Sequence, residues 1–277
     1  MRYKVKYYLI CTYLCAPFFS SGQVALGDSL SALGNYQHAV IAYEYALFQG
    51  LPASKNSDVL IKSSMCLKQL GKYNQALMQL DAVNLYQEKD SVGFLMLYEY
   101  AVNALLANKP DLAFSKIQEA YYEINDSLGL AALAPFEILA LNEMQRWEEA
   151  HSKYLQFAKR YAIVYDPYPE ILAYKMKDPK KAITLSYWLP GVGQMYAGYF
   201  WKGFFSTILN IGLAGFSGWS IWNGYFFSGA FTGTALFYLS YNGGARYAEV
   251  LANQYNAQTA NTFKAKVRNL IVIESTK

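Results

Sequence analysis

One stretch of this chain is too long and too apolar to be the core of a soluble domain. Residues 182–245 are sixty-four residues in which Lys202 is the only charged side chain. About 20 apolar residues in a helix already cross the hydrocarbon of a bilayer, so we expect a membrane domain here. Two apolar runs, about 200–221 and about 226–241, predict two spans joined by a tight turn at Asn223-Gly224.

A run of helix-breaking residues opens this stretch, where unsatisfied backbone groups in lipid are most costly. The motif consists of Pro190, Gly191, Gly193, Gln194, Tyr196 and Gly198. One interpretation is a re-entrant loop whose freed backbone groups and Gln194 amide bind a lipid headgroup, an ion or a partner helix. The other is a tight turn at the membrane interface, in which Gln194 caps the next helix.

Glycines recur in both predicted spans and allow two helices to touch backbone to backbone. They are Gly212, Gly215, Gly218, Gly229 and Gly233. We expect Gly229 and Gly233 to be helix-packing positions. An oligomer formed through the same hairpin, with copies of this chain or with another protein, is a further hypothesis.

Charge divides the chain into two parts. Residues 23–170 contain 11 Lys and Arg against 17 Asp and Glu, a balance of −6, whereas residues 171–277 contain 10 against 3, a balance of +7. Neither part has the clustered basic face of a nucleic-acid-binding protein, so no nucleic-acid partner is expected. With two histidines in the chain and Cys66 as the one cysteine beyond the N-terminal run, we expect no disulfide, metal site or cofactor.

The N-terminus has the pattern of a secretory signal. Residues 1–22 begin with basic side chains, continue with an apolar run over 7–19 and end in small residues before Gln23. We expect cleavage after Gly22, and an uncleaved anchor is the alternative. In both cases the following domain is exported, which predicts a protein of the bacterial inner membrane with a periplasmic domain.

An internal repeat follows the signal. Four alanines are spaced by 37 residues, and an aromatic residue or proline stands three positions before each of them. These repeat anchors are Ala39, Ala76, Ala113 and Ala150. Five positions before the anchors stand Gly34, Gly71, Asn108 and Gln145, where Gly or Asn tolerates the left-handed conformation that ends a helix. The pattern predicts four helix–turn–helix units over 23–165.

These units resemble tetratricopeptide repeats. The first unit matches best, with Leu26-Gly27 followed by the segment from Gly34 to Ala39 and then by Tyr43, Ala46 and Leu47. Later units depart from the pattern, since Pro110 replaces the aromatic residue and the period is 37 residues rather than about 34. The resemblance implies an all-α solenoid whose first helices line a concave groove.

By position in the repeat, eight residues would line that groove. They are Asp28, Lys62, Met65, Tyr98, Glu99, Val102, Phe136 and Leu139. Apolar side chains with scattered charges of both signs suit an apolar or amphipathic peptide as the partner. The alternative is that several of these side chains pack against neighbouring repeats.

The apolar part of the chain also resembles a family, the bacterial two-span membrane domains with a Pro-Gly-x-Gly-Gln-x-Tyr-x-Gly head. The resemblance covers about 182–245 and implies little about function, since such domains often carry another domain into the cell envelope. Before it we expect a linker over 166–181, and after it an amphipathic helix with a basic tail over 246–277.

The topology of this region contains a conflict. An exported repeat domain and two spans would leave the basic tail outside, against the positive-inside tendency. A third span over 183–199 would return the tail to the cytoplasm, but Pro190 and three glycines argue against it. Two spans remain our expectation.

Taken together, these patterns predict an all-α protein made of a signal peptide, four tetratricopeptide-like repeats and a transmembrane hairpin. Because the apolar region has almost no ionisable side chains, we expect no catalytic residues and no enzyme. The predicted function is a membrane-anchored scaffold of the cell envelope that binds a protein or peptide. The alternative is that the hairpin is the active part, as an oligomeric channel or lipid-handling module, with the repeats regulatory.

Overall fold

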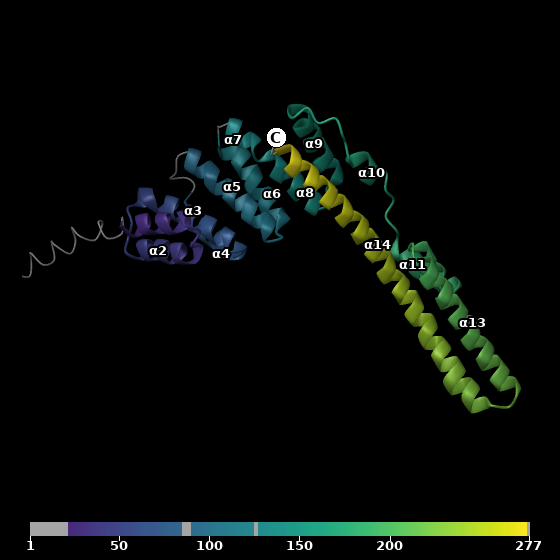
Figure 1. Ribbon diagram of the computed structural model, residues 1–277. Helices are drawn as coiled ribbons and strands as arrows, with labels where there is room; N and C mark the ends of the chain where they lie inside the picture. The colour runs from purple at the N-terminus through teal and green to yellow at the C-terminus, as the bar shows by residue number, and fades with distance from the viewer. Residues whose placement is uncertain (1–21, 85–89, 125–126, 276–277) are drawn as a thin grey trace, which may run out of the picture. The chain divides into compact units, whose positions relative to one another are not determined.

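The computed structural model describes residues 22–84, 90–124 and 127–275, and every regular element in these ranges is helical (Figure 1). The chain divides into two compact units, Met1–Asp166 and Pro167–Lys277. The expected signal peptide, 1–22, lies outside the described ranges except for its last residue.

The first unit is a succession of helices in which α2 to α6 pack against their neighbours in the chain, α6 packs against α8, and α8 packs against α9. After a helix over 22–32 come α2 (Tyr36–Phe48), α3 (Ala53–Gln69), α4 (Tyr73–Asp81), α5 (Asp90–Leu106), α6 (Pro110–Glu123), α7 (Ser127–Ala131), α8 (Ala134–Glu143) and α9 (Trp147–Arg160). The largest core cluster lies between α3 and α8, around Leu80, Leu97 and Ile117.

The 37-residue spacing marks the start of four helices in the first unit. Helices α2, α4, α6 and α9 begin at residues 36, 73, 110 and 147, and the four anchor alanines on them are 0% exposed. The residues at 34, 71, 108 and 145 have φ of +76°, +71°, +57° and +59°, which confirms that these positions end helices in the left-handed conformation.

Each of these turns is closed by the same pair of hydrogen bonds. The amides of residues 35, 72, 109 and 146 donate to carbonyls five residues earlier, at 2.8–2.9 Å. A second bond runs from each left-handed residue to the carbonyl three residues before it. This arrangement satisfies the last carbonyls of the helix and turns the chain sharply into the next one.

Ala113 provides a test of this packing. It is fully buried on α6 between α5 and α8, so we expect Ala113→Leu to overpack the contact and lower the free energy of unfolding by roughly 1–3 kcal/mol. Thermal unfolding of the full chain in detergent, followed by circular dichroism, measures the change. Ala82→Leu, at an exposed position, is the matched control, and equal melting temperatures for the two variants would contradict the helix contact.

The second unit contains a long helical hairpin and a smaller bend packed against it (Figure 1). Its elements are α10 (Tyr168–Leu172), α11 (Pro179–Trp188), α12 (Val192–Tyr196), α13 (Phe200–Trp222), the π-helix η2 (Ser228–Thr234) and α14 (Ala235–Ser275). After α13 the chain turns at Asn223-Gly224, and η2 and the start of α14 run back along α13. Helices α11 and α12 pack against each other and against α14.

Two boundaries differ from those expected from the sequence. Residues 235–275 form one continuous helix, so no break separates a membrane segment ending at 245 from an amphipathic helix over 246–277. Gly243 and Gly244 keep helical conformation, and the small size of Gly244 lets the Gln194 amide reach its carbonyl. The expected linker over 166–181 contains α10 and the start of α11, because a proline is accommodated in the first turn of each.

Within the described residues, α13 is the one helix long and apolar enough to cross a membrane. Its 23 residues give a length of about 35 Å at roughly 1.5 Å per residue, compared with about 30 Å of bilayer hydrocarbon. The second expected span, 226–241, is divided between η2 and the first turns of α14.

The hairpin is apolar outside and polar inside. Trp201, Phe205 and Ile211 of α13 are 64–67% exposed, whereas Asn210, Ser217 and Ser220 are buried. Further large exposed side chains include Phe200, Ile208, Leu209, Trp219, Trp222, Phe226, Phe227, Phe231 and Leu239. A soluble domain has the opposite distribution.

Close helix contact explains two of the glycines. A Cβ atom at Gly229 would lie 2.6 Å from the Ile221 side chain, and one at Gly233 would lie 2.6 Å from Cβ of Ser217. The Ser217 hydroxyl donates to the Gly229 carbonyl at 2.9 Å. The Ser217 hydroxyl therefore bonds across the two arms, whereas the buried Asn210 amide donates within α13, to the Ser206 carbonyl at 2.8 Å.

Candidate functional site

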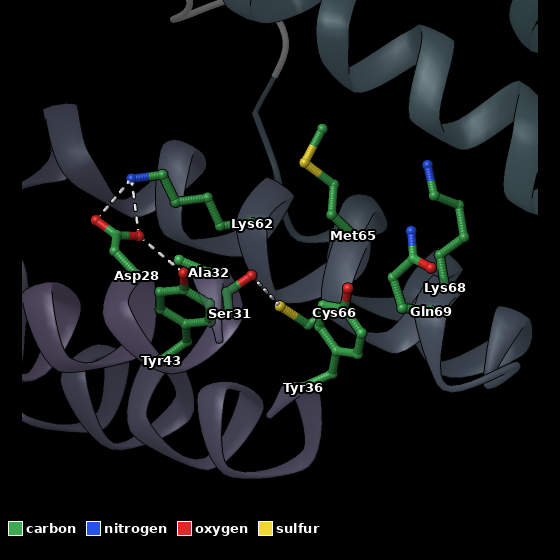
Figure 2. A pocket seen from close by; sticks show the side chains of 10 residues that line it. All are labelled: Asp28, Ser31, Ala32, Tyr36, Tyr43, Lys62, Met65, Cys66, Lys68 and Gln69. Atoms are coloured by element: carbon green, nitrogen blue, oxygen red, sulfur yellow. Dashed lines mark hydrogen bonds and ion pairs between the residues drawn. The ribbon is translucent and has the colours of Figure 1, made fainter. Parts of the chain in front are cut away.

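The first two helix pairs enclose a hollow of about 480 Å³ (Figure 2). Its walls come from the helix over 22–32, the first two turns of α2 and the second half of α3. The lining residues are Asp28, Ser31, Ala32, Tyr36, Tyr43, Lys62, Met65, Cys66, Lys68 and Gln69. We call this hollow the repeat groove. Three of the eight expected groove residues, Asp28, Lys62 and Met65, lie in it.

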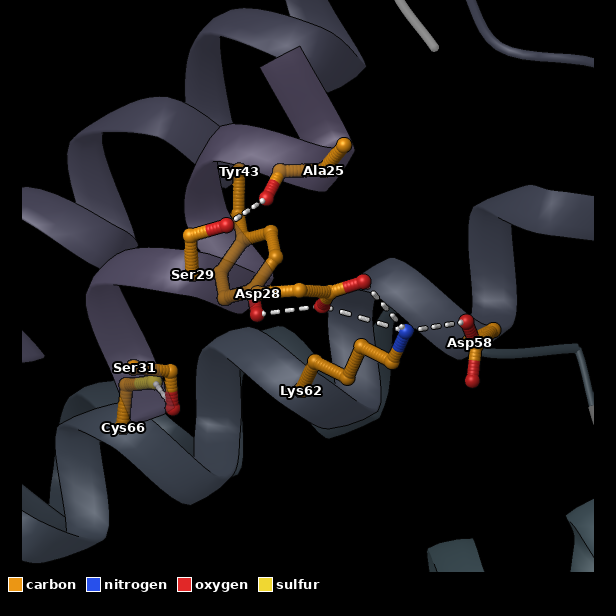
Figure 3. Close-up of polar contacts among 8 residues, drawn as sticks. All are labelled: Ala25, Asp28, Ser29, Ser31, Tyr43, Asp58, Lys62 and Cys66. Atoms are coloured by element: carbon orange, nitrogen blue, oxygen red, sulfur yellow. Dashed lines mark hydrogen bonds and ion pairs between the residues drawn. The ribbon is translucent and has the colours of Figure 1, made fainter. Parts of the chain in front are cut away.

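A charged network forms one edge of the repeat groove (Figure 3). The Lys62 ammonium lies 3.2 Å from the Asp28 carboxylate and 3.1 Å from the Asp58 carboxylate. The Tyr43 hydroxyl donates to Asp28 at 2.8 Å. Asp58 is not among the lining residues, and the network of two carboxylates and one ammonium has a formal charge of −1.

The protonation states of this network follow from its contacts. Burial and the hydrogen bond to Asp28 raise the pKa of Tyr43 above its usual range, so the hydroxyl stays protonated and acts as a donor. Burial by itself would lower the pKa of Lys62, but its bonds to Asp58 and Asp28 outweigh that effect and raise the pKa. Lys62 therefore remains a charged ammonium at neutral pH.

The floor of the groove contains a cysteine that is not activated. Cys66 is 2% exposed and its thiol lies 3.4 Å from the Ser31 hydroxyl. Burial raises the pKa of the thiol, whereas a nucleophilic cysteine needs a lowered pKa and access to solvent. Cys66 is thus a packing residue of the floor.

The other five expected groove residues lie further along the unit. Tyr98 and Phe136 are half-buried and meet edge to face, with ring centroids 5.3 Å apart. Val102 and Leu139 are also half-buried. The structure thus brings Tyr98 and Phe136 together on α5 and α8, apart from the three residues that line the repeat groove.

The expected place of Glu99 in the groove lining is wrong, because its side chain is buried inside the first unit. The residue is 2% exposed, and both carboxylate oxygens accept from the Lys68 ammonium, at 2.8 and 2.6 Å. The charge of Glu99 is therefore neutralised between α3 and α5 and is not presented to a ligand. An acid buried in a helix that packs against several neighbours needs such a partner.

A second buried acid, Glu137, was given no role by the sequence patterns. It is 1% exposed and contacts Lys153 at 2.8 Å, Gln118 at 3.0 Å and Tyr121 at 3.0 Å. The one signal in the sequence is a carboxylate within the apolar run 135–141. These contacts join α6, α8 and α9.

The Pro190–Gly198 motif forms the junction of three helices in the second unit. Gly191 has φ of +93°, and a Cβ atom there would lie 2.1 Å from the Gly203 carbonyl oxygen of α13. A Cβ atom at Gly193 would lie 1.9 Å from the Ala182 carbonyl oxygen of α11. Gly198 lies against the Tyr255 ring of α14. Glycine is required here because each position touches a different helix.

The polar groups of the motif are bonded inside the second unit. Gln194 is 3% exposed, and its amide nitrogen lies 3.3 Å from both the Ser206 hydroxyl and the Gly244 carbonyl. It therefore joins α12 to α13 and α14 and does not cap the first turn of α13. The Thr207 hydroxyl donates to the Pro190 carbonyl at 2.6 Å, and the Tyr196 hydroxyl accepts from the Asp178 amide at 3.1 Å.

Within the described ranges, no three His, Cys, Asp or Glu side chains gather into a metal site. Comparison with protein-family models, curated proteins and solved structures finds no match to this chain.

Proposed function

We propose that this chain is a membrane-anchored scaffold of the bacterial cell envelope, whose tetratricopeptide-like repeats bind a protein or peptide. The observation that carries the proposal is the repeat groove, which combines an apolar floor with a fixed charged edge and no activated nucleophile. Such a surface binds a chain segment better than it transforms a small molecule.

The recurrence of one structural unit supports a solenoid of four repeats over 23–165. The same left-handed residue, helix start and buried alanine occur four times at a spacing of 37 residues. Neighbouring helices contact each other in chain order. Stacked units of this kind leave one continuous surface formed by corresponding helices.

The charges of the groove indicate the chemistry of the partner. The edge formed by Asp28, Asp58 and Lys62 has a net charge of −1, whereas Lys68 is neutralised by Glu99. Met65 and Tyr36 supply apolar surface beside this edge. The partner that fits is an amphipathic segment with apolar anchors and a basic side chain near Asp28 and Asp58.

The outward apolar surface of the hairpin supports insertion into the membrane. Trp201 and Trp222 lie at the two ends of α13 and are 67% and 90% exposed, as interfacial tryptophans would be. We propose that α13 and the η2–α14 arm both cross the bilayer. The bonds of Ser217 to the Gly229 carbonyl and the Thr234 hydroxyl join polar groups of the two arms.

Contacts within the second unit favour two spans over three. The Asn256 side chain accepts from the Lys177 amide and donates to the Lys177 carbonyl, both at 2.8 Å. Lys266 pairs with Glu170 at 2.6 Å. Segments before and after the hairpin can make these contacts only on the same side of a membrane, so we propose an exported tail beside the exported repeats.

Site-specific crosslinking in cells tests the binding function. A photo-reactive residue replaces Met65 in the groove of the full chain, and in a second strain it replaces Tyr122, which is 87% exposed and outside the groove. We expect a defined partner to be joined at position 65 and not at 122. Substitution of Asp28 and Asp58 by Asn should weaken that product if a basic residue of the partner meets the edge.

Equal products at the two positions would contradict a specific groove. Membrane insertion is tested separately, because an inserted chain resists extraction by carbonate and is released by detergent. Extraction by carbonate alone would contradict the hairpin anchor while leaving the groove result unaffected.

One observation favours the second candidate, in which the hairpin is the working part. Added Cβ atoms at Gly212, Gly215 and Gly218 would meet nothing within 4 Å, so these glycines are not used by the arms of the hairpin. A further helix, from another copy or another protein, could pack there. Conductance or lipid transfer by the purified full chain would support this function.

A further inference from the structure

A second hollow lies on the hairpin, between the first half of α13 and α14. It has a volume of about 750 Å³, and Lys202, Phe205, Ser206 and Leu209 of α13 face Ser240 and Tyr247 of α14 across it. Lys202 and Tyr247 lie at one end, and Leu209 and Ser240 lie about two helical turns further toward the hairpin turn. We call this hollow the hairpin hollow.

The hairpin hollow is polar at one end and apolar along its side. The Lys202 ammonium donates to the Tyr247 hydroxyl at 3.1 Å and lies over the Tyr199 and Tyr247 rings, at 4.7 and 5.5 Å. Phe205 and Leu209 are 64% and 54% exposed. A ligand that fills it needs an anionic or polar head and an apolar extension.

The charge of Lys202 is not neutralised by the described residues. No Asp or Glu in the ranges that the structure describes lies within ion-pair distance of its ammonium. In the sequence no acidic residue occurs between Asp178 and Glu249. The ammonium has three donor hydrogens, and the Tyr247 hydroxyl accepts one of them.

The second unit contains further cations outside the hairpin hollow. Lys177 and Lys181 lie over the Tyr196 ring, at 5.1 and 5.5 Å, and Arg246 is an exposed neighbour of Tyr247. Aromatic rings hold these cations in place without cancelling their charge. Basic side chains at the edge of a membrane segment attract anionic lipid headgroups.

We infer that the hairpin hollow binds one anionic phospholipid. The Lys202 ammonium pairs with the phosphate, the Tyr247 and Ser206 hydroxyls provide further hydrogen-bonding groups, and an acyl chain lies along Phe205 and Leu209. Free phosphate would share the charge interaction but would leave the apolar side uncovered. The inference rests on the proposed insertion of the hairpin into the membrane.

Gly243 offers a way to close the hollow without disturbing the fold. It lines the hairpin hollow, and a Cβ atom there would meet nothing within 4 Å. Gly243→Leu therefore occupies the space of the ligand by steric means alone. Lys202→Gln removes the charge and keeps a side chain of similar length, so the two variants test the site independently.

The experiment measures lipid bound to the full chain by native mass spectrometry. The protein is taken from nanodiscs of phosphatidylcholine and phosphatidylglycerol. We expect wild type to retain one phosphatidylglycerol in preference to phosphatidylcholine, and both variants to bind it roughly tenfold more weakly. Lys175→Gln removes an exposed cation outside the hollow and should change binding by less than about twofold.

Each contrary result has a distinct meaning. Equal retention of the two lipids, or unchanged binding by both variants, would overturn the lipid site while carbonate resistance still supported the anchor. Extraction of wild type by carbonate would refute the anchor itself. Displacement of phosphatidylglycerol by millimolar inorganic phosphate would show that phosphate alone is the ligand, and would overturn the assignment to a lipid.

Discussion

Gly193→Ala is expected to disrupt the second unit, although it adds a single methyl group. The new Cβ atom would lie 1.9 Å from the Ala182 carbonyl oxygen and 2.3 Å from the Ser186 hydroxyl. Because the nearer atom belongs to the backbone of α11, the clash can be relieved only by separating α11 from α12. We expect a loss of more than about 3 kcal/mol, beyond ordinary overpacking.

The matched control is Gly218→Ala on α13. A Cβ atom at Gly218 would meet nothing within 4 Å, and alanine is a better helix former than glycine by about 1 kcal/mol. Both substitutions replace glycine by alanine, yet we expect Gly193→Ala to lower the free energy of unfolding and Gly218→Ala to raise it. Thermal unfolding and size-exclusion profiles of the full chain in detergent measure both, and equal melting temperatures would refute the close contact of α11 and α12.

Lys68→Met is expected to destabilise the first unit far more than Lys62→Met. Lys68 is bonded to a carboxylate whose side chain is 3% exposed, so its loss leaves Glu99 buried without a counter-ion. We expect a loss of roughly 3 kcal/mol. Lys62 pairs with Asp28 and Asp58, whose side chains are 45% and 57% exposed, and its replacement should cost less than about 1 kcal/mol.

A double variant separates the ion pair from the packing of the lysine stem. Replacing both Lys68 and Glu99 by Met removes the isolated charge, so most of the lost stability should return. Denaturant unfolding of wild type, Lys68→Met, Lys62→Met and the double variant measures these differences in stability. A double variant no more stable than Lys68→Met would show that the stem, and not the charge pair, was responsible.

Local patterns were sufficient to predict the four turns between helices at residues 34, 71, 108 and 145 of the first unit. The residues at 34, 71, 108 and 145 adopt the left-handed conformation because that choice depends on a few consecutive residues. The direction of the Glu99 side chain was not predictable in this way. It depends on Lys68, which is 31 residues away in the sequence.

In the junction of the second unit, too, the sequence showed which residues stand out but not which residues they contact. Its glycines and Gln194 stand out in the sequence, but two interpretations remained because neither backbone contact nor hydrogen-bond partners can be inferred from a motif of nine residues. The partners of Gln194 are Ser206 and Gly244, and Gly244 is 50 residues away. For the same reason the continuous path of α14 through Gly243-Gly244 was not expected.

The sequence by itself determined the helical class, the 37-residue recurrence and the apolar character of residues 182–245, because these follow from local conformational preference and from the cost of exposing apolar surface to water. Only the tertiary structure decided that Glu99 is neutralised inside the first unit and that Asp28, Lys62 and Met65 share one groove. It also decided that Lys202 faces a hollow with no acidic partner among the described residues. Those outcomes depend on contacts between residues far apart in the chain, because the interaction energy of two charges depends on the distance between them in space and not along the sequence.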